Sequence, residues 1–160
     1  MNALLVARAV RKVFAGGDGQ LLEILKGIDV EVRRGEFIAI VGSSGAGKST
    51  FLHMLGALDS PTTGDIWLDG SRYADMDARS AAELRNRKLG FVFQFHHLLR
   101  EFSALENVMM PLLIGGVSPG KPRSRAEEVL SDVGLAGRMT HRPAELSGGE
   151  QQRCAVARAL

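Results

Sequence analysis

The sequence has few of the features that would place it outside the cell or inside a membrane. Its 160 residues include one cysteine, Cys154, so no disulfide can form within the chain, which fits a reducing compartment. No stretch approaches the roughly 18 to 20 apolar residues of a membrane-spanning helix. The start, Met1 to Phe14, lacks the apolar region and cleavage site of a signal peptide. We therefore expect a cytoplasmic protein, in which any membrane-spanning part belongs to another chain.

The sequence also has little excess of charge. Lys and Arg number 20 and Asp and Glu number 18, which gives a net charge of +2. This balance argues against nucleic acid or an anionic membrane surface as the main partner. Hydrophobic residues make up 45% and charged residues 24% of the chain, as in an average globular domain. The composition therefore permits a packed core in one domain of ordinary size.

The first half of the chain has strand patterns and the second half has helix patterns. Strands are expected over residues 3–14, 24–32, 37–41, 65–69 and 89–93. The continuous apolar run 37–41 is typical of a strand buried on both faces. Helices are expected over residues 48–58, 80–87, 103–113, 124–133 and 148–160. A glutamate three residues after a serine predicts a capping box at Ser80, Ser103, Ser124 and Ser147.

Residues 42–49 match the pattern G-x-x-x-x-G-K-[ST], which indicates a phosphate site. A glycine-rich turn lets successive backbone N–H groups converge on a polyphosphate, and the next helix adds its positive end. Lys48 supplies a cation for the β- and γ-phosphates, and Ser49 a hydroxyl ligand for Mg²⁺. The alternative is a chance glycine loop, but the motif follows an apolar run and opens a predicted helix. The candidate binding residues are Gly42, Ser43, Ser44, Gly45, Ala46, Gly47, Lys48, Ser49 and Thr50.

A second motif, Leu-Ser-Gly-Gly-Glu-Gln at residues 146–151, also has the features of an anion site. Ser147 and two glycines stand at the start of a predicted helix, where free N–H groups and the helix dipole attract negative charge. The alternative is a plain helix cap, because Ser147 and Glu150 form a capping box. Two adjacent glycines are a costly choice for capping alone, so both interpretations stay open at this point.

Together these residues resemble the ATP-binding subunits of ABC transporters. Residues 42–50 resemble the Walker A segment, and residues 146–151 resemble the LSGGQ signature segment with Glu at its fifth position. Gln94 resembles the glutamine of the Q-loop, the alternative being a polar residue that ends a strand. Phe14 matches the aromatic residue that stacks on adenine, the alternative being core packing. The resemblance covers essentially the whole chain.

The resemblance implies an α/β fold, a P-loop (RecA-like) ABC nucleotide-binding domain. The P-loop and an antiparallel β subdomain would lie in residues 1–94 and a helical subdomain in residues 95–160, as parts of one incomplete domain. The implied catalytic residues are Lys48 and Gln94, and Ser49 and Gln94 would bind the Mg²⁺ that accompanies ATP. Two copies would pair head to tail, with ATP between the Walker A segment of one and the signature of the other. The residues implied to act on the partner's nucleotide are Ser147, Gly148, Gly149, Glu150 and Gln151.

Two longer stretches, residues 90–113 and 141–150, resemble the branch of the family that releases lipoproteins from the bacterial inner membrane. This branch implies integral membrane permease partners and a peripheral location on the cytoplasmic side of that membrane. Macrolide-export and cell-division ATPases of the family are the alternatives. An apolar cluster follows Gln94, and it either receives a helix of a membrane subunit or fills the core. Its members are Phe95, Leu98, Leu99 and Phe102.

Residues 147–160 contain no apolar run that ends in Asp-Glu. The family's Walker B strand and catalytic glutamate are therefore missing from these 160 residues, and Glu150 belongs to the signature segment. We expect the chain to be a fragment that binds nucleotide weakly, hydrolyses it negligibly and tends to aggregate. A non-hydrolysing remnant is the remaining alternative.

Overall fold

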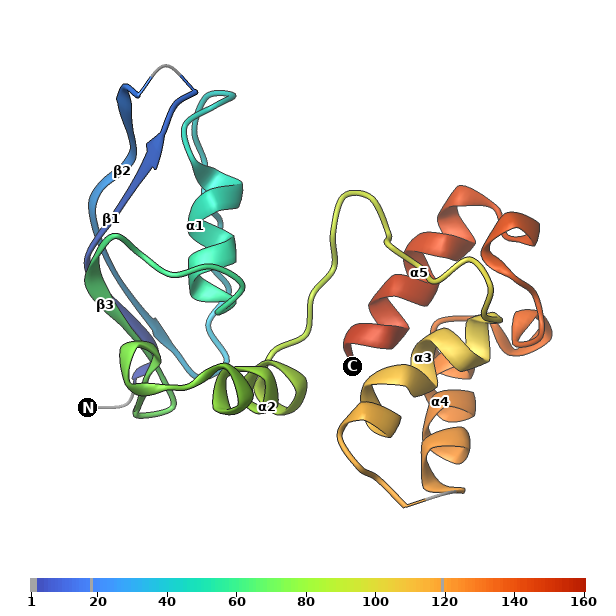
Figure 1. The fold of residues 1–160 in the computed structure, drawn as a ribbon. Helices are drawn as coiled ribbons and strands as arrows, with labels where there is room; N and C mark the ends of the chain where they lie inside the picture. The colour runs from blue at the N-terminus through green and yellow to red at the C-terminus, as the bar shows by residue number, and fades with distance from the viewer. Residues whose placement is uncertain (1–2, 18, 119) are drawn as a thin grey trace. The chain divides into compact units, whose positions relative to one another are not determined.

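The computed structural model describes residues 3–17, 19–118 and 120–160. The chain forms two compact units, residues 1–81 (unit 1) and residues 82–160 (unit 2). Figure 1 shows the strands in the first unit and most of the helices in the second. The domain boundary expected after residue 94 stays a prediction.

Unit 1 contains a four-stranded sheet in the order β2-β1-β3-β4, and every neighbouring pair in it is antiparallel. Alternating side chains of β1, including Leu5 and Ala7, are buried on one face, as the pattern of a half-exposed sheet requires. The antiparallel β part that the resemblance implied is therefore present. The strands are β1 (Ala3–Ala15), β2 (Leu21–Arg33), β3 (Thr63–Leu68) and β4 (Ser71–Arg72).

Helix α1 (Lys48–Leu55) lies against this sheet, as Figure 1 shows. Phe51 and Met54, three residues apart on one face of the helix, are buried in the core that the sheet provides. The sequence predicted a longer helix, over residues 48–58. Its end is wrong, because Gly56 ends the helix after Leu55. Leu52 is 52% exposed and lies off the buried face. The buried face is fixed by the two larger side chains that reach the sheet.

The apolar runs 37–41 and 89–93 do not form strands, so this prediction is wrong. Phe37 is 96% exposed and Val41 is 87% exposed, whereas a strand buried on both faces was expected. A strand exists only through hydrogen bonds to a neighbour, and no described strand pairs with either run. Apolar composition gives these runs a tendency to form strands, but a strand forms only where a neighbouring strand pairs with it.

Unit 2 is helical and has its own core. Ala104, Val108, Val129, Leu130 and Cys154 from three helices are buried together in this core. Among the described residues, no helix has both the length and the apolar character that a bilayer crossing requires. The helices are α2 (Ala78–Lys88, which begins in unit 1), α3 (Ala104–Ile114), α4 (Lys121–Asp132) and α5 (Gly148–Ala159). Short 3-10 turns lie at Tyr73–Asp75 in unit 1 and at Ala136–Arg138 and Pro143–Glu145 in unit 2.

Two of the four predicted capping boxes are wrong, because their helices begin earlier than expected. The carboxylate of Asp77 accepts a hydrogen bond from the backbone N–H of Ser80 at 2.7 Å, so Asp77 caps α2 and Ser80 lies inside it. Ser124 likewise lies inside α4, which begins at Lys121 and has a proline in its first turn. The boxes predicted at Ser103 and Ser147 are confirmed.

Candidate functional site

The Walker A segment is fixed to the sheet of unit 1 at Gly47. Gly47 is the N-cap of α1 and has φ of +87°, a backbone conformation that residues with a side chain rarely adopt. A Cβ at this position would lie 2.9 Å from Cγ2 of Ile24 and 2.9 Å from Cδ2 of Leu25, both on β2. Glycine is therefore required here by the backbone conformation and by the close approach of β2.

Lys48 points back over the loop that precedes it. Its Nζ donates hydrogen bonds to the backbone carbonyls of Gly42 at 2.9 Å and of Ser43 at 2.7 Å. Within the described residues, no carboxylate forms an ion pair with Lys48. The ammonium group is held by neutral acceptors only, and its charge remains available to an anion that enters the loop.

The start of α1 has the features of an open anion site. Gly47 provides no side-chain cap and the first turn carries no acidic residue, so the first backbone N–H groups are not matched by a side chain. Ser49 is exposed, and no hydrogen bond among the described residues engages its hydroxyl group. A glycine-shaped loop, an uncapped helix end, a lysine and a free hydroxyl fit a polyphosphate with a divalent cation. The other exposed residues of the loop are Gly42, Ser43, Ser44, Gly45 and Ala46, and Thr50 is half-buried.

Phe14, near the end of β1, is 42% exposed, so the alternative that it fills the core is wrong. The Nζ of Lys12 lies 5.1 Å from the centroid of its ring. Lys12 is held there by Asp59 at 2.8 Å and by the carbonyl of Ser60 at 2.7 Å. The ring is thus fixed on one side by a cation and remains accessible to a ligand.

The signature segment of unit 2 is built around a complete capping box. The hydroxyl and the backbone N–H of Ser147 each donate to Oε2 of Glu150 at 2.8 Å, and the N–H of Glu150 donates back to Oγ of Ser147 at 3.3 Å. Nε of Arg138 donates to the other carboxylate oxygen, Oε1, at 2.9 Å. The bonds from Ser147 and then from Arg138 lower the pKa of Glu150 to about 2.

The capping box does not explain the two glycines of the signature segment. A Cβ added to Gly148 would meet nothing within 4 Å, and one added to Gly149 would meet only the guanidinium of Arg153 at 3.8 Å. Both glycines are exposed, so the fold of this chain does not need them. The side chain of Gln151 donates to the carbonyls of Pro143 and Leu146, at 2.9 and 3.1 Å, and braces the loop. The segment is therefore a capped helix start whose first N–H groups lie open.

Gln94 lies on an exposed, irregular part of unit 2. Three residues later His97 has φ of +47°, an uncommon conformation for a residue other than glycine. Arg158 of α5 fixes this turn, because its guanidinium donates to the carbonyls of His96 at 2.8 Å and of His97 at 2.7 Å. The ring of Phe93 packs edge-on against His97, with centroids 5.3 Å apart. The backbone after Gln94 is thus held by the helix that carries the signature segment.

Two residues that organise this region, Arg158 and Asn107, were not found from the sequence. Asn107 of α3 is completely buried. Its side-chain amide forms hydrogen bonds of 2.8 to 3.1 Å with the backbone of Leu99, Phe102 and Ser103. A single amide inside the apolar run of α3 was the signal available for Asn107. Arg158 gave no such signal, because basic residues near a helix end are common.

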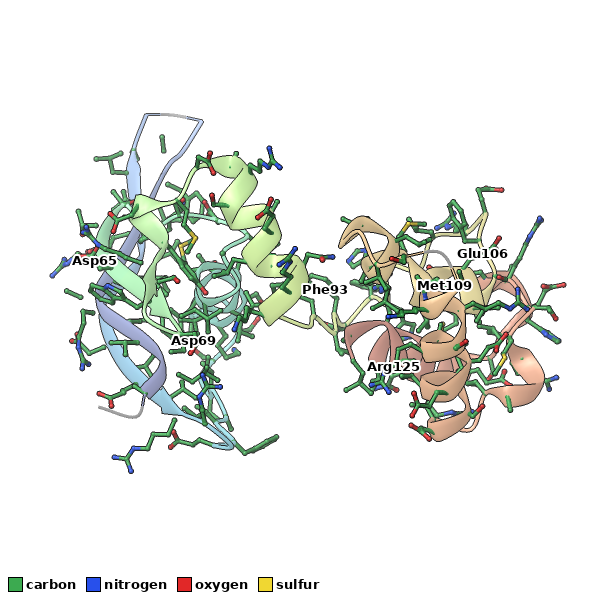
Figure 2. The ribbon with its side chains drawn as sticks, turned by 90° about the horizontal axis from the view of Figure 1, so that it is seen from below. Asp65, Asp69, Phe93, Glu106, Met109 and Arg125 are labelled. Carbon is green, nitrogen blue, oxygen red and sulfur yellow. The ribbon has the colours of Figure 1, made fainter. Side chains whose placement is uncertain are left out.

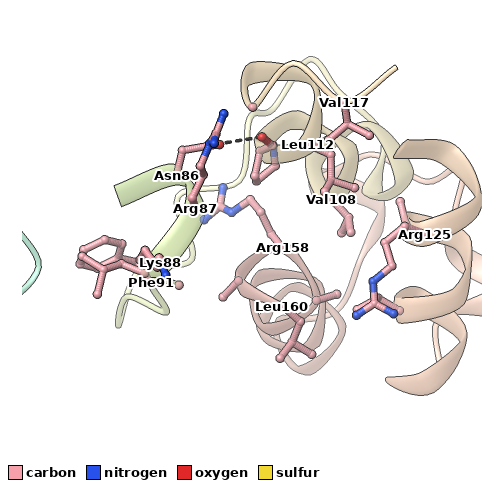
Figure 3. Close-up of a pocket in the computed structure, with 18 residues that line it drawn as sticks. Asn86, Arg87, Lys88, Phe91, Val108, Leu112, Val117, Arg125, Arg158 and Leu160 are labelled. Atoms are coloured by element: carbon pink, nitrogen blue, oxygen red, sulfur yellow. Dashed lines mark hydrogen bonds between the residues drawn. The ribbon is translucent and has the colours of Figure 1, made fainter. Parts of the chain in front are cut away.

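Unit 2 also contains a cavity of about 680 Å³, drawn in Figure 3. It lies between the segment after α2 and the C-terminal ends of α3 and α5, with α4 on one side. Asn86 donates a hydrogen bond to the carbonyl of Pro111 at its rim, at 2.9 Å. The described residues that line it include none of the predicted site residues. The motif residues instead lie in two places, the start of α1 in unit 1 and the start of α5 in unit 2.

Comparison with known proteins gives a consistent result. The ABC transporter family model matches residues 25–160. The lipoprotein-releasing system ATP-binding protein LolD of Porphyromonas gingivalis is 53% identical over 157 residues, which is 98% of this chain and 69% of that protein. LolD of Geobacter metallireducens is 52% identical over 160 residues, 100% of this chain and 71% of that protein.

Solved structures agree with these matches. The dimeric structure of MJ0796, a bacterial ABC transporter cassette, has a TM-score of 0.90 and 39% identity, and the match covers 98% of this chain and 68% of that one. A post-hydrolysis state of the same cassette, bound to ADP and phosphate, matches equally well, with a TM-score of 0.90.

Proposed function

The chain belongs to the ABC transporter family, and from this premise we propose that it is the ATP-binding subunit of a bacterial lipoprotein-releasing system. The expected cassette fold is confirmed, and the family is one of ATPases. The observation that carries the assignment of ATP binding is the uncapped start of α1, with Lys48 turned over its own loop. Relatives named for lipoprotein release, at 52–53% identity, support the choice of branch.

In this proposal the Walker A segment holds the phosphates of ATP. The first N–H groups of α1 bind the phosphate oxygens, and Lys48 exchanges the carbonyls of Gly42 and Ser43 for the β- and γ-phosphates. Ser49 would supply a hydroxyl ligand to the Mg²⁺ that accompanies ATP, and Gln94 is the other ligand expected from the sequence. The ion would neutralise charge on the phosphates. The exposed ring of Phe14 stacks on the adenine, opposite the face that Lys12 approaches.

The signature segment acts on the nucleotide of a second copy. Exposed N–H groups at Gly148 and Gly149 form a second anion-binding surface, beside the Ser147 hydroxyl that Glu150 holds. A head-to-tail homodimer gives this surface an occupant, the γ-phosphate of the partner's ATP. The dimeric cassette named above supports this arrangement.

The integral membrane partner docks after Gln94. Of the four apolar residues noted there, Leu98 packs on the core of unit 2, whereas Phe95, Leu99 and Phe102 are 75%, 43% and 38% exposed. The exposed ones suit the apolar face of a short helix from a permease subunit. Binding there would act on the turn that Arg158 holds after Gln94, and so on the glutamine assigned to catalysis. In this proposal the protein works at the cytoplasmic face of the inner membrane.

Two measurements test the proposal. Titration with a fluorescent ATP analogue, with and without Mg²⁺, should show saturable binding that is much weaker in the Lys48→Ala variant. Affinity purification of the protein, expressed from its complete reading frame, should then recover an integral membrane protein of lipoprotein release. Recovery of a cell-division or macrolide-export membrane protein would assign the chain to that branch and reject lipoprotein release.

A further inference from the structure

The carboxylate of Glu150 is an unexpected feature of an anion-binding helix start. It occupies the first turn of α5, and its pKa of about 2 keeps it ionised at any physiological pH. A negative charge at this position opposes the approach of a second copy's polyphosphate, which is itself strongly negative. The charge therefore needs to be offset if the signature segment is to receive ATP.

The chain contains an internal reference for this feature, the capping box at the start of α3. There the N–H and hydroxyl of Ser103 donate to Oε2 of Glu106 at 2.7 and 2.8 Å, and the N–H of Glu106 donates to Ser103 at 3.3 Å. These distances match those between Ser147 and Glu150 within 0.1 Å. Glu106 is labelled in Figure 2. Capping geometry alone thus does not distinguish the two helix starts.

The two boxes differ in their cationic partners. Glu150 forms an ion pair with Arg138 at 2.9 Å, and its side chain is only 18% exposed. Among the described residues, no lysine or arginine forms an ion pair with the exposed Glu106, on which Arg142 acts only at longer range. Arg138 comes from the 3-10 turn Ala136–Arg138, nine residues before Ser147, so the fold brings it to α5. The capping of a helix does not require such a partner, as the start of α3 shows.

We propose that Arg138 is a positioning residue of the signature segment, which offsets the charge of Glu150 and keeps its carboxylate on Ser147, so that the start of α5 can accept the ATP of a second copy. The inference rests on the proposed function. Glu150 then holds the hydroxyl of Ser147 in place, and Arg138 removes the electrostatic cost of using a carboxylate for that purpose. The N–H groups of Gly148 and Gly149 stay open beside the pair.

A charge-matched set of variants tests the proposal in the protein expressed from its complete reading frame. Arg138→Met leaves Glu150 uncompensated and should lower ATP turnover by about tenfold, the scale of one charge-assisted hydrogen bond. Arg138→Met combined with Glu150→Gln removes both charges, keeps a capping side chain and should return turnover to within about threefold of wild type. Glu150→Gln alone should also stay within about threefold. Arg123→Met is the matched control. It breaks an exposed arginine–glutamate pair on α4 and should leave ATP turnover unchanged.

Binding of the ATP analogue to the monomer separates this role from a structural one. The signature segment serves the partner's nucleotide, so Arg138→Met should leave the dissociation constant at the protein's own Walker A segment unchanged. The inference is overturned if Arg138→Met turns over ATP like wild type, or if the double variant is as slow as the single one. Should Arg138→Met fail to fold, a tenfold loss in Glu150→Gln alone would overturn it. Wild-type turnover no higher than that of Lys48→Ala would instead contradict the proposed function.

Discussion

The starts of α1 and α5 are built on opposite principles, although both are assigned to the phosphates of ATP. The start of α1 has a glycine N-cap, no side-chain cap and no acid in its first turn. The start of α5 has a serine cap, a glutamate in its first turn and an arginine on that glutamate. The start of α1 is left open by its backbone, and the start of α5 is organised by the side chains of Ser147, Glu150 and Arg138.

The difference between the two helix starts fits the two tasks proposed for them. A loop that must surround the phosphates needs converging N–H groups and a mobile cation, which glycines and Lys48 supply. A surface that must meet the nucleotide of another copy needs groups that are already in place, because ordering them on contact would weaken association. The comparison predicts that the start of α1 is sensitive to changes in backbone and cation, and the start of α5 to changes in its side-chain network.

The largest effect on ATP binding is expected from Lys48, the cation at the start of α1. Lys48→Ala should weaken binding of the ATP analogue by about 100-fold, the scale of losing charge-assisted hydrogen bonds to two phosphates. Lys26→Ala, which removes an exposed lysine from β2 of the same unit, should leave the dissociation constant unchanged. Equal affinity of Lys48→Ala and wild type would show that the loop alone binds phosphate.

A glycine substitution should separate close contact from backbone strain at the first site. Gly47→Ala places a Cβ against Ile24 and Leu25 at a φ of +87°, and should lower the free energy of unfolding by about 2 to 3 kcal/mol. Gly45→Ala is the matched control, because its φ is +77° but nothing lies within 4 Å of the added Cβ. It should cost about 1 kcal/mol. Equal losses in urea unfolding would show that β2 does not press on the loop.

The two capping boxes allow the second site to be tested against an internal standard. Ser147→Ala and Ser103→Ala should each lower the free energy of unfolding by about 1 kcal/mol, because they remove equivalent caps. Only Ser147→Ala should also reduce ATP turnover of the complete protein. If Ser103→Ala reduced turnover as strongly, the loss would come from helix stability and the role given to the signature segment would be wrong.

The smallest expected effect is a loss of stability at low pH, when Glu150 becomes protonated. The pKa of Glu150 is lowered from 4.5 to about 2, so its contribution to stability is fully present above pH 4.5 and is lost as the pH falls through 2. The pKa of Glu106 is also lowered, by its bonds to Ser103. In an NMR titration of the side-chain carboxyls, Arg138→Met should raise the midpoint of Glu150 and leave that of Glu106 unchanged. The opposite pattern would mean that Arg138 does not interact with Glu150 in solution.

The Walker A segment, the signature segment and the boxes at Ser103 and Ser147 depend on neighbouring residues and could be found from spacing. The same spacing was misleading at Ser80 and Ser124, because their helices begin earlier. The runs 37–41 and 89–93 could not be assigned correctly, because a strand depends on a partner that no local pattern contains. Arg138 and Arg158 were missed for the same reason, since each acts on a residue that only the fold brings close.

The central claim is that the Walker A segment of one copy works with the signature segment of another. Mixing the Lys48→Ala and Ser147→Ala forms of the complete protein tests it most directly. Each form alone should be nearly inactive, and in a head-to-tail heterodimer one site carries both changes while the other carries neither. The account predicts that mixing restores ATP turnover, to roughly a quarter of wild type if copies pair at random and the sites act independently. A mixture as inactive as its components would contradict the account.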